Sequence, residues 1–143
     1  MPFPPPSELL PHADGAVLID EVVADSPDQT TVIANITAAH PYFVVGRGVP
    51  VWVGMEMMAQ TVAARGGLLG GSDTRRSRRG MLLGIRHYDG RVPWFTEGSR
   101  LLIHGQHAFG REGGGLAACD CRIEHDGQLL ARATLVIVEE IDP

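Results

Sequence analysis

The 143-residue sequence contains no lysine, only two cysteines, and no uninterrupted apolar stretch long enough to cross a membrane. All 12 basic residues are arginine, which excludes Schiff-base chemistry and phosphate-binding loops that depend on lysine. With 17 acidic residues the net charge is −5, which argues against a general nucleic-acid-binding protein. We find no charged-then-apolar leader, and together with the scarcity of cysteine this predicts a cytoplasmic protein without membrane segments.

The sequence also lacks a convincing metal or disulfide site. Cys119 and Cys121 are two residues apart in a strand-like run, so they point the same way and suit a disulfide poorly. His104 and His107 are three apart on a strand and lie on opposite faces, so they cannot share a metal. No other cluster has ligand spacing, and we expect no metal.

Length and composition predict one domain spanning residues 1–143. Hydrophobic residues make up 44% and charged residues 20%, as in ordinary soluble globular chains. Residues 1–7 form an extended, proline-rich lead-in, and residues 71–80 form a polar, arginine-rich loop that we expect to be mobile.

The only long helical segment runs from Val51 to Leu69. Pro50 suits a helix start because its fixed φ and missing N–H cost nothing there, and several glycines end the helix. Nearly every position is apolar on all sides, which predicts a helix wrapped in protein. Glu56 and Gln60 are four residues apart and share one line of this helix. A lone acid in apolar surroundings is costly unless it is paired or protonated, which is the first indication of function.

Six stretches are typical of strands: residues 16–24, 30–37, 81–88, 100–109, 116–124 and 129–139. Asp126-Gly127 between the last two predicts a hairpin turn, because both central residues need positive φ. This order predicts an α+β architecture in which a curved antiparallel sheet of about five to six strands wraps one long buried helix. Such a sheet covers only one side of the helix, so we expect a second subunit to cover the bare helix flank and the sheet edge.

Four stretches resemble the motifs of one family: Leu9-Leu-Pro-His12 with Leu18-Ile-Asp-Glu-Val22, His40-Pro41, Pro50 with Glu56-x-x-Ala59-Gln60, and Arg91-Val-Pro93 with Glu97-Gly98. The family is the hotdog-fold 3-hydroxyacyl-[acyl carrier protein] dehydratases. Here 16 residues separate His40 from Glu56, two more than usual, and Val51 stands where the family has glycine. In this respect the sequence looks like the divergent branch from aryl-polyene-type biosynthetic clusters, which implies either a homodimer or a heteromer with a second hotdog subunit.

The resemblance implies removal of water from a 3-hydroxyacyl thioester, giving the trans-2-enoyl thioester, with the substrate on a phosphopantetheine arm and no further cofactor. His40 fits the base at C2, because an ordinary histidine pKa near 6.5 leaves much of it neutral at pH 7. Glu56 fits the acid for the departing hydroxyl, since an apolar setting keeps a proton on a carboxyl group. Gln60 would hold Glu56 or a water. In this family the histidine and the acid that meet come from opposite subunits, which implies an interfacial site.

Other residues complete the expected site. The backbone N–H groups of Val51 and Trp52, at the helix start, are expected to serve as donors to developing negative charge. Trp52 also joins Val44, Val45 and Met55 as expected lining of an acyl tunnel. The run Arg75, Arg76, Arg78 and Arg79 either is a solvated loop or docks the acidic carrier protein and the phosphate of its arm.

Two other interpretations stay open at this point. A hotdog thioesterase would use Glu56 to activate water on the same thioester. A non-catalytic hotdog subunit would complete a partner's site or hold acyl chains, an interpretation favoured by Val51 and by the lengthened loop.

Overall fold

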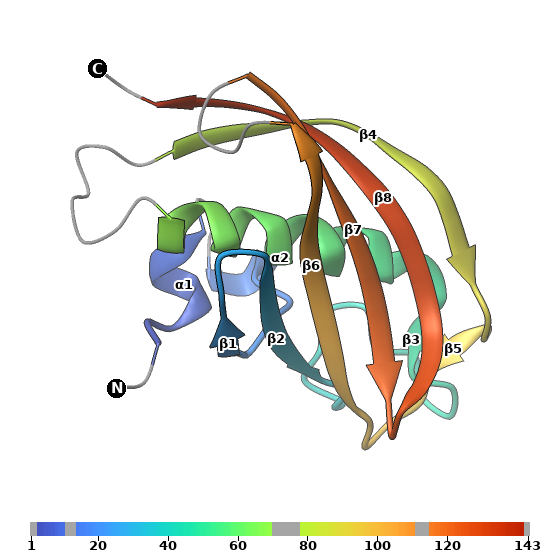
Figure 1. Cartoon of the computed structure of the whole chain (residues 1–143). Helices are drawn as coiled ribbons and strands as arrows, with labels where there is room; N and C mark the ends of the chain where they lie inside the picture. Colours follow the sequence, from blue (N-terminus) through green and yellow to red (C-terminus); the bar gives the residue numbers. More distant parts are fainter. Residues whose placement is uncertain (1–2, 11–13, 70–77, 111–114, 142–143) are drawn as a thin grey trace.

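The structure is a computed structural model that describes residues 3–10, 14–69, 78–110 and 115–141. Its largest feature is a six-stranded antiparallel sheet that curls around one helix (Figure 1). The strands, in spatial order, are β1 (Glu21–Asp25), β2 (Gln29–Asn35), β6 (Arg100–Gly110), β7 (Gly115–His125), β8 (Gln128–Ile141) and β4 (Arg78–Gly90). A second, two-stranded sheet pairs β3 (Val49–Pro50) with β5 (Trp94–Phe95). The predicted α+β architecture is confirmed.

The core lies between the concave face of the sheet and helix α2 (Gly54–Leu69). On β7, the alternate residues Cys119, Cys121 and Ile123 are buried in the same core as Met57 and Met58 of the helix. Residues between them, such as Asp120, are exposed on the outer face. This period-two alternation is the physical basis of the predicted strand, because only one face of the sheet is covered.

Helix α2 is covered over most of its surface, and one stripe is left open by the described residues. Its first turn is a 3₁₀ segment, η2 (Val51–Val53), which follows Pro50. Val53, Met57, Gln60 and Ala64 are buried, whereas Trp52 and Glu56 are exposed. The predicted buried helix wrapped by the sheet is therefore present, except for a stripe at Trp52 and Glu56 that stays open within the described residues.

The turn between β7 and β8 forms where the sequence predicts it. Asp126 and Gly127 have φ of 50° and 76°, which confirms the predicted hairpin turn. Two very short helices, α1 (Pro6–Leu9) and η1 (Asp14–Ala16), precede β1.

Three boundaries differ from the prediction. The first strand begins at Glu21 rather than at residue 16, because Leu18 N–H bonds to the side chain of Gln60 instead of to a neighbouring strand. Strand β4 begins at Arg78, so residues 78–80 belong to the sheet and not to the expected mobile loop. Residues 71–77 lie outside the described part. Strands β3 and β5 were not predicted, because each has only two residues and is too short to show an alternating pattern.

Arg65 ties the end of α2 to the β1–β2 turn. Its guanidinium is buried, donates to the carbonyl of Ser26 and to Thr30 Oγ1 at 3.1 Å each, and lies 3.6 Å from Asp25. Across the described residues, no helix has the length and apolarity to cross a membrane.

Candidate functional site

Gln60 holds Glu56 in place. The Gln60 side chain is fully buried, and its Oε1 accepts a 2.7 Å bond from the backbone N–H of Leu18. Its Nε2 donates to the carbonyl oxygen of Ala16 at 2.8 Å and to Glu56 Oε1 at 3.1 Å. The predicted contact between Gln60 and Glu56 is therefore present. Because Leu18 and Ala16 occupy both ends of the amide, Gln60 cannot turn over, and it presents only its N–H donors to Glu56.

Glu56 lies on the uncovered flank of α2. Its side chain is exposed, one turn along the helix from exposed Trp52. The expectation of a buried acid is wrong for the single chain, since apolar neighbours in the sequence do not guarantee cover from another element. The residues that the structure describes do not give Glu56 an apolar setting.

His40 lies in a tight turn that leads toward the helix. Its backbone N–H bonds to the carbonyl of Thr37, and its own carbonyl accepts from Phe43, at 3.0 Å each. The ring is half-buried, and Nδ1 accepts a 3.1 Å bond from the backbone N–H of Tyr42. Nε2 is shielded from solvent and has no hydrogen-bond partner within the described ranges. Burial lowers the pKa of His40, an effect that the nearby Asp20 carboxylate partly offsets.

An aromatic chain connects the His40 loop to the start of the helix. The ring centroids of His40 and Tyr42 are 6.1 Å apart, and those of Tyr42 and Trp52 are 5.6 Å apart in an edge-to-face arrangement. The bridge between Val44 and Gly48 then turns the loop back toward β3. The two predicted site segments therefore meet at Tyr42, a residue that sequence reasoning did not single out.

The predicted tunnel lining does not enclose a tunnel within one chain. Val44 and Val45 are 40% and 89% exposed, Trp52 is 55% exposed, and Met55 is half-buried. Trp52 and Met55 lie near Glu56 on the start of the helix, and Val44 and Val45 are open on the loop that precedes it. A second surface is needed to enclose a slot.

The prediction of Val51 as a free backbone donor is wrong. Its N–H bonds to the carbonyl of Pro93 at 3.1 Å, continuing the β3–β5 pairing into the helix start. The Val51 side chain packs into the space left by Gly90, and the Tyr88 hydroxyl donates to the Val51 carbonyl. Burial raises the pKa of Tyr88 to about 12, which keeps this donor protonated. For Trp52, the role of backbone donor stays a prediction.

The arginine run is only partly covered by the structure. Arg75 and Arg76 lie outside the described residues, whereas the backbones of Arg78 and Arg79 belong to β4. Their docking role stays a prediction.

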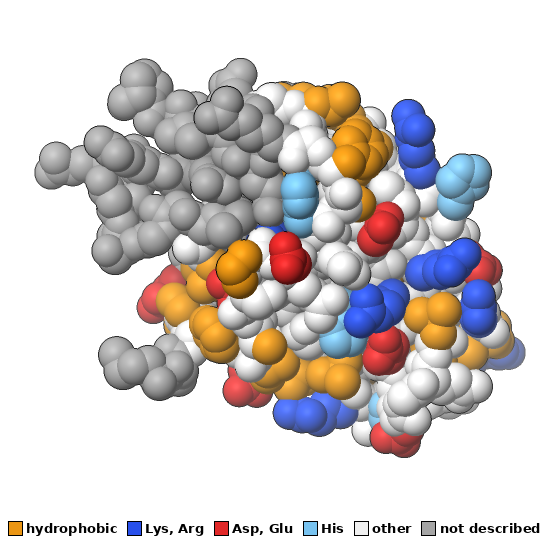
Figure 2. All heavy atoms as spheres, viewed as in Figure 1, with side chains coloured by type: hydrophobic (Ala, Val, Ile, Leu, Met, Phe, Trp, Pro, Cys, Tyr) orange, Lys and Arg blue, Asp and Glu red, His pale blue; other side chains and the backbone are white. Residues whose placement is uncertain are grey.

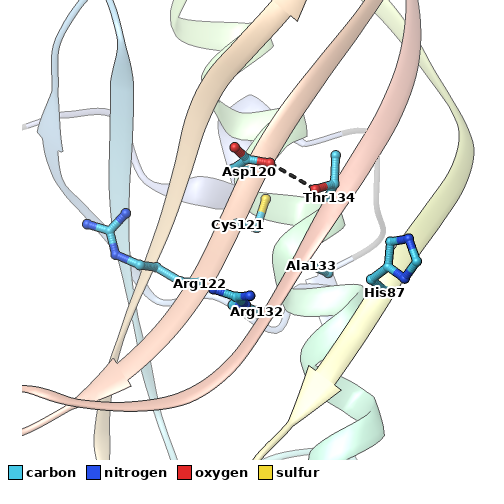
Figure 3. A pocket seen from close by; sticks show the side chains of 7 residues that line it. All are labelled: His87, Asp120, Cys121, Arg122, Arg132, Ala133 and Thr134. Atoms are coloured by element: carbon cyan, nitrogen blue, oxygen red, sulfur yellow. Dashed lines mark hydrogen bonds between the residues drawn. The ribbon is translucent and has the colours of Figure 1, made fainter.

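A hollow of about 460 Å³ lies elsewhere, on the outer face of the sheet. It is lined by His87, Asp120, Cys121, Arg122, Arg132, Ala133 and Thr134 (Figure 3). Acidic, basic and histidine side chains are mixed over this face (Figure 2), and the Thr134 hydroxyl donates to Asp120 at 2.8 Å. None of the predicted site residues lines it. The hollow is therefore a polar indentation in the outer face, separate from the region around Glu56.

His104 is a buried polar residue of the same outer face. Its Nδ1 lies 2.8 Å from Thr31 Oγ1, and its Nε2 is 3.6 Å from Glu124. Burial and the Arg122 guanidinium lower the pKa of His104, and Glu124 partly offsets them. His107 instead bonds through Nε2 to the carbonyl of Gly110, so the two histidines have different partners.

Comparison with known proteins decides the family. The model of the ApeP-like family, described as ApeP dehydratase, matches residues 4–143. The chain belongs to the ApeP-like family. This ApeP-like chain is thus a hotdog-fold dehydratase, a hydro-lyase, as the motifs around His40 and Glu56 predicted.

Solved structures agree with this assignment. The dehydratase heterocomplex ApeI:P from Xenorhabdus doucetiae is similar with a TM-score of 0.84 and 26% identity, over 96% of this chain and 91% of that one. A hypothetical thioesterase with coenzyme A from Streptococcus pneumoniae has a TM-score of 0.66 at 12% identity, over 83% and 84% of the two chains. A mutant of the phenylacetic acid degradation protein PaaI from Thermus thermophilus has a TM-score of 0.63 at 14% identity, over 82% and 90%. The last two show the hotdog fold alone. The comparison with curated proteins gave no match.

Proposed function

We propose that this ApeP-like dehydratase removes water from 3-hydroxyacyl thioesters carried by an acyl carrier protein, and so supplies trans-2-enoyl thioesters for polyene-type biosynthesis. The observation that carries the proposal is Glu56, held by a locked Gln60 on the uncovered flank of α2. His40 lies at the other end of the aromatic chain that begins at Trp52. Both residues are catalytic in this proposal, and the substrate's phosphopantetheine arm is the only carrier group required.

The active assembly contains a second hotdog subunit. Glu56, Trp52 and Val44 are exposed in the single chain, so a partner surface is needed to exclude water from the thioester. The similar ApeI:P protein is a heterocomplex, and we extend a heteromer of this kind to this chain. Cys119 and Cys121 are reduced thiols buried in the core, which fits a reducing, cytoplasmic setting.

The test is hydration of a trans-2-enoyl pantetheine thioester, followed by the loss of enoyl absorbance. Wild type, His40→Ala and Glu56→Gln are compared, each alone and with a co-purified second hotdog chain. We expect each substitution to slow hydration at least about 10²-fold, the usual scale for losing a catalytic group.

The outcomes separate the competing functions. Release of free thiol without water addition identifies a thioesterase and contradicts the proposal. Full activity of both variants in the assembled complex shows that this chain only completes a partner's site, which contradicts the assignment of His40 and Glu56.

A further inference from the structure

Arg47 is the one formally charged residue between Asn35 and Glu56, although the chain as a whole carries a net charge of −5. This segment contains the His40 turn, the loop that follows it and the start of α2. Along the segment, an approaching anion therefore meets a single cation and no carboxylate before Glu56.

The loop around Arg47 is closed by backbone hydrogen bonds. The N–H groups of Arg47 and Gly48 both donate to the Val44 carbonyl at 3.0 Å, and the Val44 N–H donates to the Gly48 carbonyl at 2.7 Å. Gly46 and Gly48 have φ of 79° and 117°, a backbone region that other residues rarely adopt. A Cβ on Gly48 would also overlap the carbonyl oxygen of Phe95. The backbone of Arg47 is thus held in one position by the fold.

The side chain of Arg47 is oriented as well. Its guanidinium lies over the ring of Trp94, 5.5 Å from the ring centroid. Stacking of this kind covers one face of the planar group and leaves the N–H donors along its edge open. Arg47 is exposed, and no carboxylate within the described residues forms an ion pair with it. This cation is therefore prepared for an anion from outside the chain.

Arg47 also lies near the candidate site. It precedes Val51 by four residues, so the two Cα atoms are at most about 14 Å apart. Val44, to which Arg47 is hydrogen-bonded, and Trp52 are exposed members of the expected tunnel lining. The two regions are near enough for one extended ligand to contact both.

We propose that Arg47 binds the phosphate of the phosphopantetheine arm that carries the acyl thioester. The inference rests on the proposed dehydratase function and names the anchor for the end of the arm remote from the reacting carbons. The guanidinium fork matches two phosphate oxygens, and its orientation over Trp94 is fixed before the substrate arrives. A single cation suits one phosphate, whereas recognition of an acidic protein surface uses several charges. Arg47 thereby fixes how far the thioester reaches toward Glu56.

The experiment measures hydration of one trans-2-enoyl chain carried on pantetheine or on phosphopantetheine, which differ only in the phosphate. Wild type, Arg47→Gln and Arg132→Gln are compared in the assembled, active protein. We expect Arg47→Gln to lose about 5–20-fold in kcat/KM with the phosphopantetheine thioester, the scale for a hydrogen bond to a charged group, and less than about twofold with the pantetheine thioester. Arg132→Gln removes an equal charge from the outer face of the sheet and should leave both values unchanged.

The outcomes against the assignment are distinct. Equal losses of Arg47→Gln on the two thioesters, or no loss on either, overturn it. Carrier-bound substrate is the third comparison and should show the same loss as the phosphopantetheine thioester. A loss confined to the carrier-bound substrate would place Arg47 against the carrier protein and also overturns the phosphate assignment.

Binding without turnover separates this inference from the proposed function. In calorimetric titrations, wild type should bind phosphopantetheine more tightly than pantetheine by about the same factor, and Arg47→Gln should bind the two equally. Equal affinities in wild type overturn the role of Arg47 whatever the activity. Absence of turnover in wild type, alone and with its partner subunit, instead overturns the proposed function.

Discussion

One amide organises the candidate site at the scale of single residues. The Gln60 side chain accepts a hydrogen bond from the Leu18 N–H and donates to the Ala16 carbonyl and to the Glu56 carboxyl group. It therefore holds the segment before β1 against the helix and also orients Glu56. A leucine of similar size would keep the volume and lose all three bonds. The local fold and the geometry of the candidate site therefore depend on the same side chain.

Gln60→Leu should lower the free energy of unfolding by about 1–3 kcal/mol, because it leaves the N–H of buried Leu18 without its partner and removes the bond to the carbonyl of Ala16. Glu56→Gln is the matched control: it changes an exposed side chain and should alter stability by less than about 0.5 kcal/mol while abolishing turnover. Urea unfolding of both variants checks this. Equal stability of Gln60→Leu and wild type would show that Gln60 is not structural.

A second prediction at the residue scale is that His104 makes the stability of the fold depend on pH. Burial and Arg122 lower its pKa in the folded state, so the unfolded chain binds a proton more readily. Stability is therefore complete above about pH 6.5, the ordinary histidine value, and falls as the pH drops from there toward the lower folded pKa. In His104→Gln, thermal unfolding between pH 7 and 5 should lose part of this slope. The half-buried His40 contributes a slope of the same sign, so some of the pH dependence should remain. An unchanged slope would contradict the proposed cause.

At the scale of elements, the start of α2 is defined by close contacts rather than by propensity. Gly54 packs against the Tyr88 hydroxyl, and that hydroxyl donates a hydrogen bond to the carbonyl of Val51. The β3–β5 pair adds the bond from Val51 to Pro93. The entry of the helix is thereby tied to two distant segments.

Gly54→Ala should destabilise the protein by about 1–3 kcal/mol, the cost of overpacking. The added methyl would overlap the Tyr88 hydroxyl and come within 2.9 Å of Ile123 Cδ1. Gly66→Ala, in the same helix, meets nothing within 4 Å and should stabilise by up to about 1 kcal/mol through helix propensity. Thermal melts of the two variants should therefore shift in opposite directions, and shifts of the same sign would contradict this account.

At the scale of the whole molecule, the described part of the chain leaves at least two surfaces open to a partner. Strand β4 ends the sheet and exposes Leu82 and Leu83, at 42% and 55%. The flank of α2 that bears Glu56 is the other surface. An unpaired edge strand and an open apolar flank are features that a partner subunit would cover.

Recognition of the carrier protein also belongs to this scale. Reversing the charge of Arg75 and Arg76 should raise KM for carrier-bound substrate about tenfold, on the order of 1.4 kcal/mol, through lost attraction to an acidic partner. The same variant should act on a short pantetheine thioester nearly as well as wild type. Equal effects on both substrates, measured by steady-state kinetics, would refute the docking role.

Most elements and the contact between Glu56 and Gln60 could be predicted from the sequence because they depend on local chemistry: period-two alternation, a proline before the helix, Asp126-Gly127 in a turn, and the i, i+4 spacing of Glu56 and Gln60. Folding in three dimensions decided the rest. Whether Glu56 is covered depends on how far a distant sheet reaches, and the Val51 N–H bonds to Pro93, which is 42 residues further along the chain. The contact between the Tyr42 N–H and Nδ1 of His40 depends on the closed shape of the turn. Such features depend on which groups come into contact when the chain folds, and a sequence pattern does not specify those contacts directly.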